Sequence, residues 1–100
     1  MRIIALSTFR RFWESHPNHA DARTPLVELY RYMENATYPT PQALKAMLRT
    51  ASILKAGRVV FNVGGNKYRV IMAIDYQRQL GFIRFVGTDA QYDQINAETV

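Results

Sequence analysis

Three arginines, Arg58, Arg69 and Arg84, stand in a part of the chain whose other residues mostly favour β-strands and burial. An arginine guanidinium offers a planar fork of N–H donors that matches the oxygens of a phosphate group. On one face of a sheet, three such groups would form a basic surface able to grip a phosphodiester backbone. The residue types and their placement therefore predict an RNA-binding face.

The basic residues of the chain are concentrated around these arginines. The net charge is +5, yet residues 45–84 hold eight basic side chains and a single acidic one, Asp75. The eight are Lys45, Arg49, Lys55, Arg58, Lys67, Arg69, Arg78 and Arg84. Such a block inside a folded domain indicates a polyanion or an acidic partner, which makes Lys45, Arg49 and Lys55 candidate RNA contacts beside Arg58. The alternative is an ordinary solvated basic surface.

The composition sets the class of protein. A chain of 100 residues with 48% hydrophobic and 21% charged residues is expected to form one folded domain, residues 1–100. The absence of cysteine excludes disulfides and thiolate metal sites, and His16 and His19 lack the spacing of a metal site, so no metal is expected. The apolar run 3–6 is too short for a signal peptide or a membrane span, so a cytoplasmic protein without membrane contact is expected.

The first half of the chain has helical periodicity. Residues 2–6 are expected to form a short strand, after which Ser7 could cap a helix that ends before Pro17. The apolar stripe of this helix would be Phe9, Phe12 and Trp13. The segment 16–22 is expected to be a loop.

Two more helices are predicted before the pattern changes. One begins near Asp21 or Thr24, with an apolar stripe of Leu26, Leu29, Tyr30 and Met33. The next is capped by Thr40, with Pro41 in the first turn, where a missing N–H does no harm, and its apolar stripe would be Leu44, Met47 and Leu48.

Alternation replaces helical periodicity near residue 50 and predicts strands at 58–63, 68–76 and 82–87. Thr88 and Gln91 match a capping box, which predicts a short helix at the end of the chain. The order predicts an α+β fold, in which N-terminal helices pack on one face of a small, mainly antiparallel β-sheet and a short C-terminal helix follows.

The turn between the first two strands decides which side chains share a face. A two-residue loop, Gly64-Gly65 or Gly65-Asn66, gives paired residue numbers with an odd sum. Arg58 and Asn62 then share a face with Arg69, whereas an odd-length loop would separate them.

An even loop at the second turn would place Arg84 on the same face, directly opposite Asp75. The other face would be an apolar layer for the helices, made of Val59, Phe61, Val63, Tyr68, Val70, Met72, Ile74, Tyr76, Ile83 and Phe85. A non-functional alternative is that Asp75 pairs with Arg84 while Arg58 and Arg69 lie along the surface.

Two stretches, RVVFNVGGNKYRVIMAIDY and IRFVGTDAQYDQIN, resemble the HigB-type toxins of type II toxin–antitoxin systems, within the RelE-like superfamily. The earlier FWESHP and TPLVELYRYMENATYPTPQALKA extend the resemblance over nearly the whole chain, and it implies a RelE-like fold. It also implies a ribosome-dependent endoribonuclease of translated mRNA, without metal or cofactor, in which the 2′-hydroxyl attacks the adjacent phosphate. The implied partner is a HigA-like helix-turn-helix antitoxin. The toxin would contact DNA only indirectly, through this antitoxin.

The resemblance also implies site residues. Arg69 and Arg84 correspond to phosphate contacts and Tyr92 to the C-terminal tyrosine of RelE-like sites, whereas Asn62 and Lys67 beside the hairpin are weaker candidates.

One residue departs from the family pattern of Gly-Thr-His, two variable residues and Tyr-Asp, because Asp89 stands where the histidine is expected. Aspartate at neutral pH is mostly an ionised acceptor. Asp89 could act only as a base, or it could be a favourable charge at a helix start, with catalysis left to Arg69, Arg84 and Tyr92. A weak or inactive enzyme is a third outcome.

Two other functions remain compatible with the same basic face. A non-catalytic module of this fold could block RNA or a protein target without cleavage. The face could also serve as the dock for an acidic antitoxin, which would cover the site that it inhibits.

Overall fold

A computed structural model describes all residues of the chain, Met1–Val100, and confirms the α+β class. The elements are β1 (Arg2–Ile4), α1 (Leu6–Glu14), the 3₁₀ helix η1 (Pro17–Ala22), α2 (Arg23–Glu34), α3 (Pro41–Met47), β2 (Ser52–Ile53), β3 (Arg58–Val63), β4 (Tyr68–Asp75), β5 (Leu80–Thr88) and α4 (Asp89–Tyr92). No helix has the length and apolar character needed to cross a bilayer.

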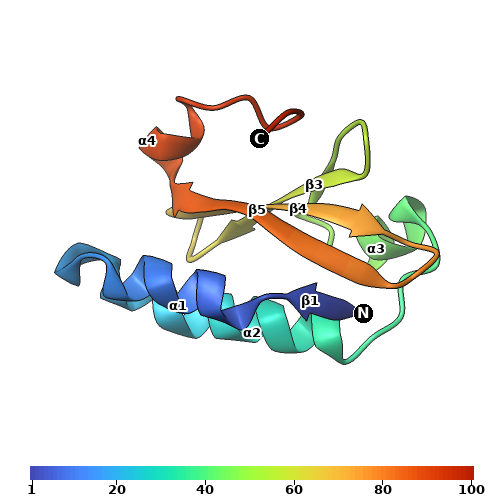
Figure 1. The fold of residues 1–100 in the computed structure, drawn as a ribbon, viewed down its shortest axis with the longest axis horizontal. Coiled ribbons are helices and arrows are strands. Elements are labelled where there is room, and N and C mark those ends of the chain that lie inside the picture. Colours follow the sequence, from blue (N-terminus) through green and yellow to red (C-terminus); the bar gives the residue numbers. More distant parts are fainter.

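The strands form one five-stranded sheet in the order β1-β5-β4-β3-β2. The first strand runs parallel to β5, and every other neighbouring pair is antiparallel. Helices α1 and α2 lie along one face of the sheet, while α4 and the C-terminal segment lie over the other (Figure 1). We call the second of these the open face.

The α1 helix begins earlier than expected. Its N-cap position is Ala5, which makes no side-chain hydrogen bond, so the prediction that Ser7 caps this helix is wrong. The strand β1 leads directly into the helix at Leu6, which leaves Ser7 inside the first turn. The predicted apolar side of α1 is confirmed, because Phe9 is fully buried and Phe12 and Trp13 pack against the core.

Within the expected loop 16–22, residues Pro17–Ala22 form a 3₁₀ helix with His16 as its N-cap. Proline presets the backbone for a helical turn at Pro17, and the Nδ1 atom of His16 accepts a hydrogen bond from the Asn18 N–H at 3.0 Å. A 3₁₀ helix of this length leaves no 3.6-residue apolar pattern in the sequence.

The α3 helix has the predicted cap, but its predicted apolar stripe is wrong at Met47, which is exposed, whereas Leu44 is buried and Leu48 packs against the core. Thr40 accepts a hydrogen bond from the Ala43 N–H at 3.1 Å, and Pro41 occupies the first turn. The strand β2, which pairs with Val59 and Val60, was not predicted, because two exposed residues are too few to show alternation.

The turn between β3 and β4 has the tight form expected. Lys67 donates its N–H to the carbonyl of Gly64 at 3.2 Å, which makes Gly65 and Asn66 the central pair. Their φ angles are +64° and +69°, as a type I′ turn requires.

The register that follows from this turn confirms the shared face of β3 and β4. Arg58 lies opposite Ala73, and Asn62 lies opposite Arg69. All four side chains therefore belong to the open face.

The pairing predicted at the second turn is wrong. Asp75 lies opposite Leu80 rather than opposite Arg84, because the unpaired loop is residues 76–79. The Asp75 carboxylate instead accepts a hydrogen bond from the Arg78 N–H at 3.0 Å and lies 3.9 Å from the guanidinium of that arginine.

A β-bulge then shifts the register within β5. Ile71 pairs with Phe85 and Met72 with Ile83, which leaves Arg84 between them without a partner. The ring of Phe85 consequently lies on the open face with Ile71, not on the helix-covered face as predicted. Val86 takes the place against the helices.

The main core lies between the sheet and the helices. Its buried members are Met1, Ile3, Phe9, Ala22, Leu26, Leu29, Met33, Tyr38, Leu44, Ala51, Val59, Phe61, Val63, Tyr68, Val70, Met72 and Ile74. Tyr76 packs against this cluster, as predicted. Val60 and Ile71 are also buried, although they belong to the open face.

Two methionines allow a matched test of this core. Met33 has no exposed surface, whereas 56% of Met47 is exposed. We expect Met33→Ala to lower the free energy of unfolding by about 2–5 kcal/mol, and Met47→Ala to change it by less than about 0.5 kcal/mol, in urea denaturation. Equal losses in the two variants would contradict this assignment of the core.

Candidate functional site

The open face is built from three rows of residues that lie side by side across β3, β4 and β5. The rows are Asn62, Arg69 and Gly87; then Val60, Ile71 and Phe85; then Arg58, Ala73 and Phe82. Apolar side chains fill the middle row, so the charged groups of these rows lie in the two outer ones.

The first row carries a compact group of polar side chains around Arg69. The guanidinium donates from Nη1 to the Asn66 carbonyl at 2.9 Å, and its Nη2 lies 2.9 Å from Oδ1 of Asp89. Its central carbon lies 5.8 Å from the centre of the Tyr92 ring. We call Arg69, Asp89 and Tyr92 the Arg69 cluster.

The cap of α4 holds two members of this cluster in place. Thr88 accepts a hydrogen bond from the Gln91 N–H at 3.2 Å, and the Gln91 side chain accepts one from the Thr88 N–H at 2.8 Å. This capping box was predicted, and it places Asp89 and Tyr92 directly after β5.

Close packing around Gly87 brings α4 down onto the sheet. A Cβ atom at this position would lie 2.6 Å from the Phe85 ring and 2.7 Å from the Gln91 side-chain oxygen. Phe85 in turn contacts the Tyr92 ring at a centroid distance of 6.4 Å. A larger residue at position 87 would have to displace the Phe85 ring and the Gln91 side chain.

Arg84 lies on the same face but has no partner within the chain. It stands at the bulge of β5, and its guanidinium lies 5.9 Å from the centre of the Phe82 ring. It makes no intramolecular hydrogen bond or ion pair and is exposed. From strand spacings, its Cα lies roughly 10 Å from that of Arg69, and its guanidinium lies beside Phe82, in the row farthest from Arg69.

Arg58 shares the face but does not join the other two arginines. It lies four residues before Asn62 on β3, which separates it from the Arg69 row by about 13 Å. Its Nη2 donates to the carbonyl of Val100 at 2.8 Å, and its Nε is buried without a partner. The expected convergence of three guanidiniums is therefore wrong, because Arg58 is held by Val100 and lies far from Arg69.

Lys67 points away from the Arg69 cluster. Its amine forms an ion pair of 2.5 Å with Asp21, which also accepts a hydrogen bond from the Tyr68 hydroxyl. The hydrogen bond from Lys67 is the main reason that the pKa of Asp21 lies below its ordinary value, and Asp21 likewise raises the pKa of Lys67. The pKa of Tyr68 is raised, first by burial and then by Asp21.

The other basic candidates lie at the opposite edge of the sheet. The Lys45 amine donates to the carbonyls of Arg49 and Ala51 and so closes the end of α3. Arg49 follows α3, and Lys55 lies in the turn before β3; both are exposed. None of these three side chains contacts the Arg69 cluster.

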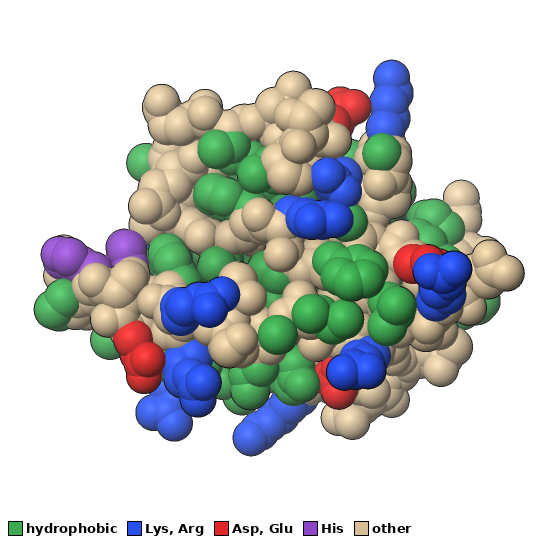
Figure 2. All heavy atoms as spheres, viewed as in Figure 1, with side chains coloured by type: hydrophobic (Ala, Val, Ile, Leu, Met, Phe, Trp, Pro, Cys, Tyr) green, Lys and Arg blue, Asp and Glu red, His purple; other side chains and the backbone are tan.

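Basic side chains outside the open face do not form one patch. In the view of Figure 2, the Lys and Arg side chains are spread over the sheet and helix layers, with two adjoining groups near the centre, and some stand beside an acidic group. Net charge alone therefore does not mark the site on the surface.

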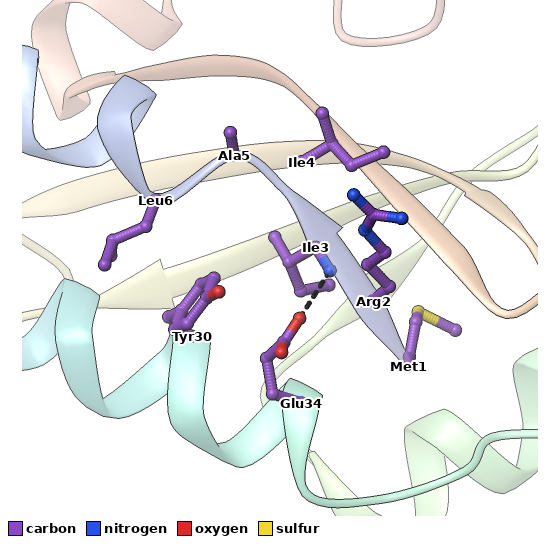
Figure 3. A pocket seen from close by; sticks show the side chains of 8 residues that line it. All are labelled: Met1, Arg2, Ile3, Ile4, Ala5, Leu6, Tyr30 and Glu34. Carbon is purple, nitrogen blue, oxygen red and sulfur yellow. Dashed lines mark hydrogen bonds between the residues drawn. The ribbon is translucent and has the colours of Figure 1, made fainter.

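The largest hollow, about 600 Å³, lies at the β1 edge of the sheet. It is lined by Met1, Arg2, Ile3, Ile4, Ala5, Leu6, Tyr30 and Glu34. The Glu34 carboxylate there accepts the Ile3 N–H at 2.7 Å (Figure 3). No residue of the Arg69 cluster lines this hollow.

Sequence reasoning missed the contributions of Asn66 and Phe85 to the site. Asn66 was expected only as a turn residue, and the contact of its carbonyl with Arg69 leaves no mark in the sequence. Phe85 was assigned to the wrong face because a bulge has no reliable sequence signal.

Comparison with known proteins gives matches over most of the chain. The family model described as the HigB toxin, a RelE-like toxic component of a toxin–antitoxin system, matches residues 22–95. The mRNA interferase toxin HigB of Escherichia coli K12 is 31% identical over 99 residues, which cover 97% of this chain and 92% of the relative. The mRNA interferase HigB of Shigella flexneri matches equally, and that of Escherichia coli O6:H1 is 29% identical over 95% of this chain and 91% of its own.

The lowered pKa of Asp21 predicts how its contribution to stability depends on pH. A carboxylate whose pKa falls on folding stabilises the folded state above its ordinary value of 3.8, and this stabilisation is lost as the pH falls through the lower, folded-state pKa. We expect Asp21→Asn to destabilise the protein at neutral pH, and the difference from wild type to shrink in acid. Denaturation of both proteins at a series of pH values from 7 to 2 measures this difference in the free energy of unfolding.

Asp93→Asn is the control for this measurement, because Asp93 is exposed and its side chain makes no ion pair. A wild-type advantage over Asp21→Asn that does not change down to the lowest pH would contradict the assignment.

Proposed function

Because the chain belongs to the HigB family, the RelE-like toxic components of toxin–antitoxin systems, we propose that it is an endoribonuclease that cleaves mRNA and thereby inhibits translation and growth. The mRNA interferase activity named for its relatives supports this proposal. The observation that carries it within the chain is the Arg69 cluster, with Arg84 beside it on the open face.

Cleavage proceeds by attack of the ribose 2′-oxygen on the adjacent phosphorus, with departure of the 5′-oxygen of the next nucleotide. Negative charge builds up on the phosphate oxygens in the transition state, and positioned cations lower the energy of that state. Arg69 is well suited to this task, since its orientation is already set by Asn66 and Asp89. Arg84 supplies a second guanidinium that no group within the chain occupies.

The proton transfers of this reaction fall to groups beside Arg69. Tyr92 offers the hydroxyl of the cluster, and neither histidine belongs to it, because His16 and His19 lie on the η1 segment beside Phe12. The Asp89 carboxylate is paired with Arg69, where it orients the guanidinium in the free protein and repels an incoming phosphate. We therefore assign Asp89 to orientation and Tyr92 to proton transfer.

The weaker RNA contacts divide by location. Asn62 lies opposite Arg69 and can extend the site along β3. Arg58, Lys45, Arg49, Lys55 and Lys67 are proposed only as peripheral attraction for the RNA backbone, since the cluster contains none of them.

The cellular setting of this activity is proposed from the family. The enzyme acts in the cytoplasm on mRNA that is bound to the ribosome. A HigA-like helix-turn-helix antitoxin inhibits it, and the toxin associates with DNA only through this antitoxin. The segment 35–74 contains no acidic residue, which suits an acidic partner as well as RNA.

A non-catalytic toxin that blocks RNA without cutting it is the second candidate. The feature that favours it is the absence of an imidazole from the Arg69 cluster, since a group titrating near neutral pH commonly moves the proton in such chemistry. Primer extension on mRNA after expression separates the two functions. Discrete cleavage sites support the nuclease, and intact transcripts in arrested cells support the blocking protein.

Loss of either arginine should remove toxicity without unfolding the protein. We expect Arg69→Ala and Arg84→Ala each to lower the cleavage rate by about 100-fold or more, because each removes a cation from the transition state. The measurement is mRNA cleavage in a translating extract, together with growth on induction. Melting curves report whether each variant is folded.

Arg31→Ala is the matched control, because Arg31 is an exposed arginine of α2 on the opposite side of the sheet. It should keep full toxicity. The proposed site is wrong if the Arg69 and Arg84 variants remain as toxic as this control.

Substitution of Asp89 distinguishes an orienting carboxylate from a catalytic base. We expect Asp89→Asn to retain cleavage and to bind RNA several-fold more tightly, because a like charge is removed from the phosphate-binding arginine. Filter binding and cleavage assays on the same RNA measure the two effects. A loss of cleavage of about 100-fold with unchanged binding would instead identify Asp89 as the general base.

A further inference from the structure

The β3–β4 turn contacts the Arg69 cluster through its main chain. The carbonyl of Asn66 accepts the Nη1 hydrogen bond of Arg69 at 2.9 Å, and the carbonyl of Lys67 accepts the N–H of Asp89 at 3.2 Å. The same short turn therefore holds the guanidinium and the first residue of α4.

The side chains of the two turn residues take no part in these contacts. Asn66 is exposed and its amide makes no hydrogen bond, while the amine of Lys67 is directed to Asp21. The Arg69 cluster therefore depends on the orientation of the main-chain carbonyls of Asn66 and Lys67, not on their side chains.

The direction of those carbonyls depends on the positive φ of Asn66, +69°. Asparagine and glycine adopt this left-handed conformation readily, whereas a β-branched residue is strongly disfavoured there. A residue that forces φ negative would rotate the adjoining peptide groups and withdraw the carbonyls from their partners.

The Arg69 guanidinium is held within the chain at both terminal nitrogens, and 17% of the side chain is exposed. Of its five N–H donors, one is given to Asn66, and the ion pair with Asp89 lies at the other terminal nitrogen. The turn thus fixes the plane of the guanidinium while donors remain for phosphate oxygens.

We propose that the β3–β4 turn positions Arg69 and the start of α4 through the main-chain carbonyls of Asn66 and Lys67, which makes Asn66 a positioning residue of the site. The anchor of this turn is the Asp21–Lys67 ion pair, which ties it to the η1 segment on the helix side. The consequence for RNA cleavage rests on the function proposed above, but the positioning itself does not.

Three variants separate backbone conformation from side-chain chemistry. Asn66→Gly keeps the left-handed conformation and removes the side chain, whereas Asn66→Val opposes that conformation. Ala56→Val is the control for strain alone, because Ala56 is exposed with φ +58° in the turn before β3, away from the Arg69 cluster.

The first readout is the set of guanidinium N–H signals of Arg69 in the nuclear magnetic resonance spectrum, identified by their absence in Arg69→Lys. We expect resolved, slowly exchanging signals in wild type, Asn66→Gly and Ala56→Val, and their loss in Asn66→Val. Asn66→Val should also bind and cleave RNA up to about 100-fold less well, whereas Asn66→Gly retains both activities.

Each other outcome overturns the positioning role. Retained Arg69 signals in Asn66→Val would show that the carbonyl does not orient the guanidinium. Lost signals in Asn66→Gly would assign the effect to the asparagine side chain, and equal losses in Ala56→Val would assign it to general strain. If wild type cleaves no RNA while the signals behave as expected, the proposed nuclease function fails and the positioning role stands.

Discussion

The antiparallel register of β3 and β4 is the constraint on which both faces of the molecule depend. Side chains alternate along a strand, so a shift of one residue would send Arg69 into the core and Val70 into solvent. The turn at Gly65 and Asn66 fixes this register, because the hydrogen bond from the Lys67 N–H to the Gly64 carbonyl closes it and sets Val63 opposite Tyr68. The same turn thus determines the core and also supports the site.

The parts of the fold that could be predicted from the sequence are those with local chemical causes. Thr40 with Pro41, the Gly65-Asn66 turn and the Thr88–Gln91 capping box each specify a local structure through a hydrogen bond or a dihedral preference. The face shared by Arg58 and Arg69 followed from the turn by parity alone.

The parts that could not be predicted depend on contacts between distant segments. The β-bulge opposite Ile71 and Met72 places Phe85 on the open face and leaves Arg84 without a paired residue. No local residue pattern predicts this bulge. The withdrawal of Arg58 likewise depends on Val100, which lies 42 residues away in the chain. Membership of a face was therefore predictable for β3 and β4, whereas the face of Phe85 on β5 and the convergence of side chains were not.

The contact between Glu34 and the Ile3 N–H bears on how the molecule behaves when it is alone in solution. The strand β1 ends the sheet, and an uncovered end strand would present hydrogen-bonding groups to any passing polypeptide. With its N–H already occupied from α2, Ile3 cannot recruit a strand of a neighbouring copy unless that carboxylate is first displaced. A single acidic side chain of α2 thus blocks strand addition at Ile3, on the β1 edge of the sheet.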